Sequence, residues 1–233
     1  MKIKITSSGY YLPDKIETAE ELAPKINKTA DWIISRTGVK ERRVSDIDVD
    51  KMGAIAAKNA LSNGEKPDLI LNASGVGKQV IPDTSVFFQK ELGFDGIPSF
   101  TIHATCLSFI VALNTAASFI SQGVYKRILI ISADRGTRGR NYNQAESAAL
   151  LGDAAAAIIV EKTPMNESSK YMDFSMETWP EGSSLTEVRG GGTNLHPQDS
   201  KTTIDDNLFS MNGPMIYKMA RKKVYKMIQK DLK

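Results

Sequence analysis

The sequence has one cysteine, Cys106, and two histidines among its 233 residues. A single cysteine excludes an intramolecular disulfide, and one cysteine with two distant histidines makes no zinc site. No stretch approaches the roughly 18 apolar residues that cross a bilayer. The N-terminal stretch MKIKITSSGYYLP has no apolar core as long as that of a signal peptide. These absences predict a soluble, cytoplasmic protein with no metal centre and no membrane association.

The common loops that bind nucleotides or calcium are also absent. Residues 75–77 read Gly-Val-Gly, but Val80 stands where the dinucleotide fingerprint needs a third small residue. Gln79 occupies the position of the Ser or Thr in a phosphate-binding P-loop. The acidic residues at 46, 48 and 50 are spaced like the start of a calcium loop, whose obligatory glycine is replaced by Lys51. We therefore expect no tightly bound cofactor.

The net charge of the chain is small, but basic residues are concentrated at the C-terminal end of the sequence. The chain has 30 basic and 27 acidic residues, a net charge of +3. Residues 218–233 contain seven Lys or Arg and one Asp, a local charge of +6, so the remaining residues sum to −3. A nucleic-acid-binding protein is usually more basic throughout. The pattern predicts a basic C-terminal helix on a slightly acidic body, and no nucleic-acid partner.

Short apolar stretches alternate with amphipathic ones, the pattern of an α/β fold with a largely parallel sheet. We expect a turn over Gly9–Pro13 and a linker near Pro164. The expected strands are Lys2–Ser7, Asp68–Ala73, Ser99–Ile102, Arg127–Ser132 and Ala155–Val160. The expected helices are Thr29–Arg36, Met52–Ser62, Thr84–Leu92, a segment from just after Cys106 to about Gln122, and Pro214–Lys230.

Cys106 lies between a short expected strand and a long apolar helix. The first turn of a helix has unpaired backbone N–H groups, and its dipole stabilises negative charge. Both effects favour the nucleophilic thiolate, and the same N–H groups can bind an oxyanion during acyl transfer. The alternative is that Cys106 is a small buried hydrophobe, the commoner role of a free cysteine.

The segment His-Ala-Thr-Cys-Leu-Ser-Phe around Cys106 resembles the nucleophile turn of 3-oxoacyl-acyl-carrier-protein synthase III, the initiating ketosynthase of the thiolase superfamily. Residues 31–43, DWIISRTGVKERR, resemble the W-I-x-x-R-T-G-I-x-x-R-R segment of that family. Residues 151–157, LGDAAAA, resemble its F-G-D-G-A-x-A strand entry. The resemblance extends over the whole chain. It implies a thiolase-like fold with α-β-α-β-α layers, whose N-terminal half is complete over 1–163 and whose C-terminal half is partial over 164–233.

The resemblance also implies roles for individual residues. The catalytic residue is Cys106, which takes an acyl group from acyl-CoA and then condenses it with a malonyl group on the acyl carrier protein. Coenzyme A is held by Trp32, Arg36, Thr37 and Tyr217. The acyl pocket includes Ile81, from across a dimer interface, and Leu107. The carrier protein docks on Lys218, Arg221 and Lys222. The implied assembly is a homodimer, or a heterodimer with a related subunit.

Three departures from the family pattern suggest an atypical member. Leu107 and Ser108 replace small residues after the cysteine, and Ala145 stands where many members have an Arg for coenzyme A. The family's catalytic His and Asn lie beyond the part of the pattern that this sequence matches. The alternative function is therefore a non-catalytic or partner-dependent ketosynthase-like subunit, or a truncated copy that lacks the condensing His and Asn.

Overall fold

The computed structural model describes residues 1–231 and divides into two compact units. The first unit comprises residues 1–15, 43–135 and 153–173. The second comprises residues 16–42, 136–152 and the chain from Phe174 onward. These units are defined by packing, so the division of the sequence at residue 163 into two thiolase-like halves stays a prediction.

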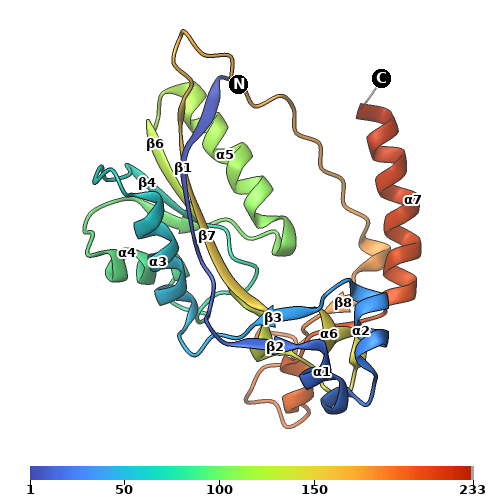
Figure 1. The fold of residues 1–233 in the computed structure, drawn as a ribbon. Coiled ribbons are helices and arrows are strands. Elements are labelled where there is room, and N and C mark those ends of the chain that lie inside the picture. The colour runs from blue at the N-terminus through green and yellow to red at the C-terminus, as the bar shows by residue number, and fades with distance from the viewer. Residues whose placement is uncertain (232–233) are drawn as a thin grey trace. The chain divides into compact units, whose positions relative to one another are not determined.

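The first unit is built on a five-stranded sheet (Figure 1). Its strands, in spatial order, are β1 (Ile3–Tyr11), β7 (Asp153–Lys162), β6 (Arg127–Arg135), β4 (Leu69–Asn72) and β5 (Ser99–Thr101). β6, β4 and β5 are parallel, whereas β7 is antiparallel to both of its neighbours. β7 runs antiparallel to the other four strands, so the expectation of a largely parallel sheet is wrong for the two ladders that β7 forms, with β1 and with β6.

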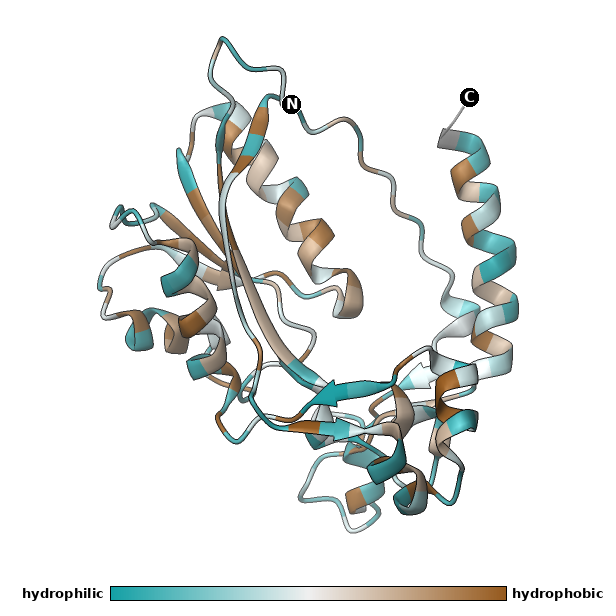
Figure 2. Ribbon diagram, in the orientation of Figure 1, coloured by the Kyte–Doolittle hydropathy of each residue, from teal (hydrophilic) through white to brown (hydrophobic). Residues whose placement is uncertain are grey.

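Helices cover both faces of this sheet. α3 (Val49–Ala60) and α4 (Thr84–Leu92) pack on one face, and α5 (Ser108–Gln122) packs on the other. Successive side chains of a strand point to opposite faces. Leu129 accordingly joins the core under α3 and α4, whereas Ile130 joins the core under α5. Figure 2 shows the hydrophobic residues concentrated on the central strands and on α5. The first unit is therefore a sheet between two helical layers.

The second unit consists of short elements. They are β2 (Ile16–Thr18), α1 (Ala19–Leu22), α2 (Ala30–Thr37), β3 (Glu41–Arg43), α6 (Ala145–Leu150), β8 (Thr186–Glu187), β9 (Ser210–Met211) and α7 (Gly213–Asp231). α2 begins where the Thr29 side chain accepts a hydrogen bond from the Trp32 N–H, and it ends at Gly38 in the left-handed conformation. Buried residues of α1, α2 and α6 form one small core.

One helical segment is long and apolar enough, by length and composition, to cross a membrane. It covers Thr105–Gln122, contrary to the expectation that no stretch comes close to this length. The core helix of a soluble protein passes the same test. Ala112, Ala116 and Ala117 of α5 are fully buried against the sheet, although only 28% of the segment is buried.

The first strand runs further than its sequence predicts. A turn was expected from Gly9, but β1 continues through Tyr11, and Gly9 pairs with Ala157 of β7. Gly9 also lies directly against the backbone of α3. A Cβ atom at Gly9 would collide with the Ala56 carbonyl oxygen and lie 2.5 Å from the Ala60 nitrogen. The glycine therefore marks a close approach of strand and helix, not a turn.

This close approach predicts that Gly9→Ala destabilises the protein. Backbone atoms cannot move aside as a flexible side chain can, so we expect a loss of about 1–3 kcal/mol of unfolding free energy, the usual cost of overpacking. Urea denaturation followed by circular dichroism measures it. Gly192→Ala is the matched control, because nothing lies within 4 Å of a Cβ atom there. Equal midpoints for the two variants would contradict the prediction.

Candidate functional site

Cys106 lies in a single 3-10 turn, η2 (Thr105–Leu107), between β5 and α5. Its thiol is free and exposed to solvent. Thr105 has a φ of +50°, a left-handed backbone conformation that residues other than glycine rarely adopt. Backbone strain of this kind costs about 1–3 kcal/mol and occurs most often at functional sites. The interpretation of Cys106 as a buried hydrophobe is wrong, because this strained turn leaves the cysteine at the surface.

Ser108, the first residue of α5, fixes the shape of this turn. Its hydroxyl accepts a hydrogen bond from the Ala104 N–H at 2.9 Å and donates one to the Thr105 carbonyl at 2.7 Å. One buried side chain thus binds the backbone on both sides of the strained residue. The sequence gives no sign of this role, because both hydrogen bonds of Ser108 go to backbone groups.

The turn lies at the edge of the sheet where three parallel strands end. The carboxyl ends of β4, β5 and β6 meet there, because β4 is parallel to both of its neighbours. Open α/β sheets bind their ligands at this edge. The loop after β4 contains Ile81, which is 79% exposed, and the segment after β5 contains Cys106 and Leu107. Three of the predicted site residues therefore follow neighbouring strands.

Polar side chains hold this edge together. The Asn72 amide donates to the Thr101 hydroxyl at 2.9 Å and so joins the ends of β4 and β5. The Asp134 carboxylate at the end of β6 accepts from the N–H groups of Gly75 and Val76 at 2.8 and 3.1 Å. Burial raises the pKa of Asp134 above its ordinary value, although these two hydrogen bonds oppose the shift. Sequence reasoning missed Asp134, because Gly75 and Val76 are 59 and 58 residues away from it.

Trp32, Arg36 and Thr37 share α2 in the second unit. Trp32 is half-buried, and the Lys28 ammonium lies 5.2 Å from the centre of its ring. Arg36 is exposed and lies four residues later, so the two side chains share one helix face. The Thr37 hydroxyl is engaged locally, donating to the Ile33 carbonyl at 2.7 Å.

The remaining predicted residues lie on α7. Tyr217 is 68% exposed, and Lys218, Arg221 and Lys222 are exposed as well. α7 is therefore the basic helix that the charge pattern predicts. The structure thus places the cysteine, Leu107 and Ile81 in the first unit, and the residues of α2 and α7 in the second.

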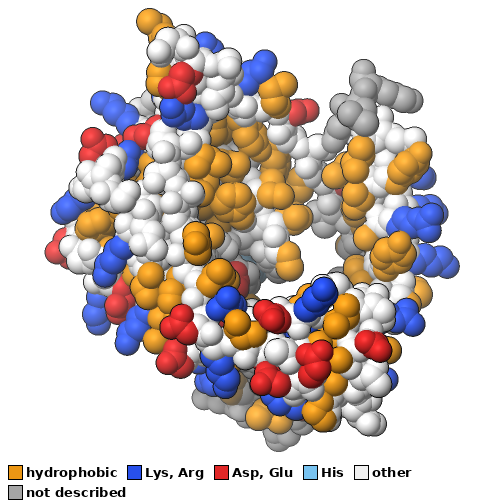
Figure 3. All heavy atoms as spheres, in the orientation of Figure 1, with side chains coloured by type: hydrophobic (Ala, Val, Ile, Leu, Met, Phe, Trp, Pro, Cys, Tyr) orange, Lys and Arg blue, Asp and Glu red, His pale blue; other side chains and the backbone are white. Residues whose placement is uncertain are grey.

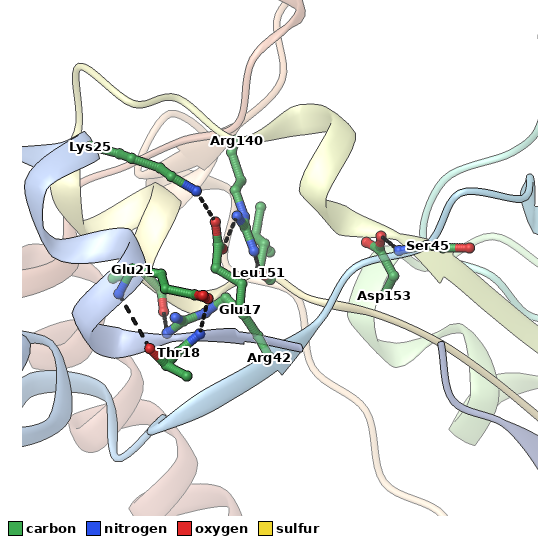
Figure 4. A network of polar contacts seen from close by, with 10 residues as sticks. Glu17, Thr18, Glu21, Lys25, Arg42, Ser45, Arg140, Leu151 and Asp153 are labelled. Atoms are coloured by element: carbon green, nitrogen blue, oxygen red, sulfur yellow. Dashed lines mark hydrogen bonds and ion pairs between the residues drawn. The ribbon is translucent and has the colours of Figure 1, made fainter. Parts of the chain in front are cut away.

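A buried cluster of charges lies in the second unit beside α6 (Figure 4). Glu17 accepts from Arg140 and Lys25, each at 2.5 Å. Arg140 also donates to the carbonyl of Leu151 at 2.7 and 3.1 Å, and Arg42 donates to that of Ala149 at 2.8 Å. Burial alone would raise the pKa of Glu17, but the hydrogen bonds from Lys25 and Arg140 outweigh it and hold the pKa below its ordinary value.

Hydrophobic side chains gather over α5 on the surface of the first unit (Figure 3). The exposed members near the cysteine are Leu107, Phe109 and Ile110, between 36% and 50% exposed. Among residues 1–231 no group of three or more His, Cys, Asp or Glu side chains could hold a metal ion. The site therefore offers an exposed thiol, the start of a helix and apolar surface.

A scan of protein families matches residues 100–180, which include the cysteine turn, to 3-oxoacyl-[acyl-carrier-protein] synthase III. Among curated relatives, the β-ketoacyl-[acyl-carrier-protein] synthase III of Prochlorococcus marinus strain MIT 9215 is 32% identical over 95% of this chain and 68% of its own length. The corresponding protein of Koribacter versatilis is 30% identical over 100% of this chain and 72% of its own length.

Solved structures agree with the sequence comparison. The 3-oxoacyl-[acyl-carrier-protein] synthase III of Aquifex aeolicus superposes with a TM-score of 0.80 at 28% identity, over 93% of this chain and 67% of that one. The enzyme of Pseudomonas aeruginosa gives a TM-score of 0.84 over 99% of this chain and 70% of that one, and at 23% identity it supports the fold alone. The fold places the chain in the thiolase-like class. Within that class, the chain belongs to the 3-oxoacyl-[acyl-carrier-protein] synthase III family.

Proposed function

We propose that this protein is an acyltransferase of the 3-oxoacyl-acyl-carrier-protein synthase III type, with Cys106 as its nucleophile. The observation that supports this most directly is the exposed thiol on a strained turn at the start of α5, in a chain of this family. The matched family segment includes this turn. Acyl-CoA is the donor, and no tightly bound cofactor is needed.

In the first step, the Cys106 thiolate attacks the thioester carbonyl of acyl-CoA. A bond forms between the cysteine sulfur and the acyl carbon, the bond to the coenzyme A sulfur breaks, and coenzyme A leaves as its thiol after taking up a proton. Backbone N–H groups at the start of α5 would stabilise the oxyanion of the tetrahedral intermediate. The helix dipole stabilises the attacking thiolate.

In the second step, the acyl group condenses with a malonyl group on the acyl carrier protein. Loss of carbon dioxide leaves a carbanion that attacks the acyl carbon, and the cysteine thiolate is released. Lys218, Arg221 and Lys222, exposed on α7, would steer an acidic carrier protein by charge. Ile81 and Leu107 would contact the acyl chain, with Ile81 reaching the partner's pocket in a dimer. The enzyme would act in the cytoplasm.

Intact-protein mass spectrometry after incubation with a panel of acyl-CoAs tests the proposal. A donor should add the mass of one acyl group and release an equal amount of free coenzyme A. If a folded preparation forms no adduct with any donor, the proposed acyltransferase activity is overturned. That result would favour the non-catalytic or partner-dependent subunit.

Trp32 supplies a separate prediction about coenzyme A binding. An indole can stack on the adenine ring, and stacking of a base on an aromatic side chain contributes about 1–3 kcal/mol. We expect Trp32→Ala to weaken coenzyme A binding by about tenfold, since 1.4 kcal/mol is tenfold in affinity. Isothermal titration calorimetry with coenzyme A measures the change.

The second tryptophan offers a matched control. Trp179 is also half-buried, and the Lys223 ammonium lies 5.3 Å from its ring centre, much as Lys28 does at Trp32. Trp179→Ala should leave coenzyme A affinity unchanged. If both variants bind as tightly as the parent protein, Trp32 has no part in holding the nucleotide.

A further inference from the structure

The loop between β4 and α4 exposes aliphatic side chains and follows the strand next to the one that leads to the cysteine turn. Val76, Val80 and Ile81 are 68%, 81% and 79% exposed. The loop leaves the sheet from β4, and the segment with Cys106 leaves from its parallel neighbour β5. We call residues 75–82 the aliphatic loop. A loop with so few buried apolar contacts of its own must be held in place by polar ones.

Both ends of the aliphatic loop are tied to neighbouring strands. Its first residues, Gly75 and Val76, donate their N–H groups to Asp134 of β6. Just beyond its last residue, Asp83 accepts from the Thr101 N–H of β5 at 3.2 Å. These contacts fix the ends but leave the middle of the loop, between Val76 and Ile81, to other groups.

Lys78 holds the middle of the loop. Its ammonium forms an ion pair with Asp50 and lies 3.8 Å from the Asp48 carboxylate, both at the start of α3. Its backbone N–H donates to the Thr84 hydroxyl at 2.9 Å, and its ammonium lies 5.0 Å from the ring centre of Phe87. The hydrogen bond to Asp50 raises the pKa of Lys78, so the ammonium stays charged at neutral pH.

Asp50 is an unusual partner for a loop lysine. It is only 4% exposed, and its other carboxylate oxygen is buried with no hydrogen-bond partner among residues 1–231. A buried carboxylate is costly unless a cation compensates it. Moving Lys78 away would strand that charge, so the pair strongly favours one position of the loop.

We propose that Lys78 and Asp50 are a positioning pair, which holds the aliphatic loop where Ile81 limits, across the dimer interface, the length of the acyl chain that the enzyme accepts. The inference rests on the proposed acyl transfer and adds the residues that set its donor selectivity. A pocket wall discriminates between chains that differ by methylene groups only if it stays in place. Loss of the pair should therefore relax selectivity without removing the nucleophile.

Competition between two donors tests the pair. Equal concentrations of acetyl-CoA and hexanoyl-CoA are incubated briefly with the protein, and the ratio of the two adducts is read by intact mass. Both donors meet the same folded molecules, so partial unfolding does not change the ratio. We expect Lys78→Met and Asp50→Asn each to bring the ratio of the two adducts about fivefold closer to one. This change is smaller than the discrimination that a rigid pocket achieves for one methylene group.

Three further variants sharpen the test. Lys78→Arg keeps the charge and should keep the parent ratio. The double variant Asp50→Asn, Lys78→Met should shift the ratio no more than the larger single change, because the two residues act as one unit. Lys4→Met breaks a more exposed ion pair, Lys4 to Glu167 at 2.7 Å, elsewhere in the first unit and should leave the ratio unchanged.

The outcomes separate this inference from the proposed function. If Lys78→Met and Asp50→Asn both keep the selectivity of the parent protein, the proposed positioning role is overturned. The adducts themselves would still support acyl transfer. If Ile81→Ala shifts the ratio while both of these variants keep the parent selectivity, the loop matters but the pair does not position it. Absence of any adduct on the parent protein overturns both proposals.

Discussion

The Cys106→Ala variant is expected to form no acyl adduct with a donor that modifies the parent protein. Removing a nucleophile that forms a covalent intermediate costs several orders of magnitude in rate, so acylation should slow by at least about a thousandfold. Because the chain has a single cysteine, any thioester must form at this position. Intact mass after incubation with acyl-CoA measures the loss.

The fold should survive this change. Cys106 is exposed and its thiol is free, and surface substitutions usually change stability by less than about 0.5 kcal/mol. Equal thermal midpoints for the variant and the parent would show that only the chemistry is lost. An adduct that persists in Cys106→Ala and resists hydroxylamine would lie on another side chain and would contradict the assignment.

The Arg140→Met variant is expected to cause the largest loss of stability. Arg140 and Glu17 are 3% and 6% exposed, and their ion pair is 2.5 Å long. Breaking a buried pair by removing one partner costs about 3–5 kcal/mol, because the other charge stays buried. The Leu151 carbonyl loses two donors as well. Chemical denaturation measures the loss.

Two further variants test the cause. Glu17→Leu combined with Arg140→Met removes both charges, so it should cost less than Arg140→Met alone. Lys25→Met should cost much less, because the Lys25 side chain is half exposed and such pairs contribute about 1 kcal/mol or less. If the double variant is as unstable as the sum of its parts, the cluster is not an electrostatic unit.

This cluster also has a defined pH dependence. The pKa of Glu17 in the folded protein lies below its ordinary value of 4.5. The unfolded chain therefore binds a proton first as the pH falls, and the stability that Glu17 contributes is present above about pH 4.5 and is lost as the pH drops through the folded pKa. Arg140→Met should reduce this acid-dependent part of the stability curve.

Local signals predicted several elements accurately. Thr84–Leu92 is helical as expected, because Asp83 caps its start and Gly93 ends it in the left-handed conformation. The helix with Trp32 begins after Thr29 for the same kind of reason. Such signals lie within a few residues of the element that they delimit, so a sequence displays them directly.

Sequence reasoning missed the features that depend on contacts between residues distant in the sequence. β1 passes through Gly9 because β7 pairs with it and α3 packs against it. The contact between Asp134 and Val76 joins residues 58 positions apart. The Glu17–Arg140 pair joins residues 123 positions apart. The cysteine itself was recognised from its neighbours, whereas Ser108 acts through backbone groups that no sequence pattern displays.

The single exposed thiol has a practical consequence. A maleimide dye would label this protein at one defined place, with no need to remove other cysteines first. The dye would report directly on the carboxyl edge of the sheet. An acyl group on the sulfur would block the label, so the fraction of unlabelled protein would count occupied sites by fluorescence in a gel.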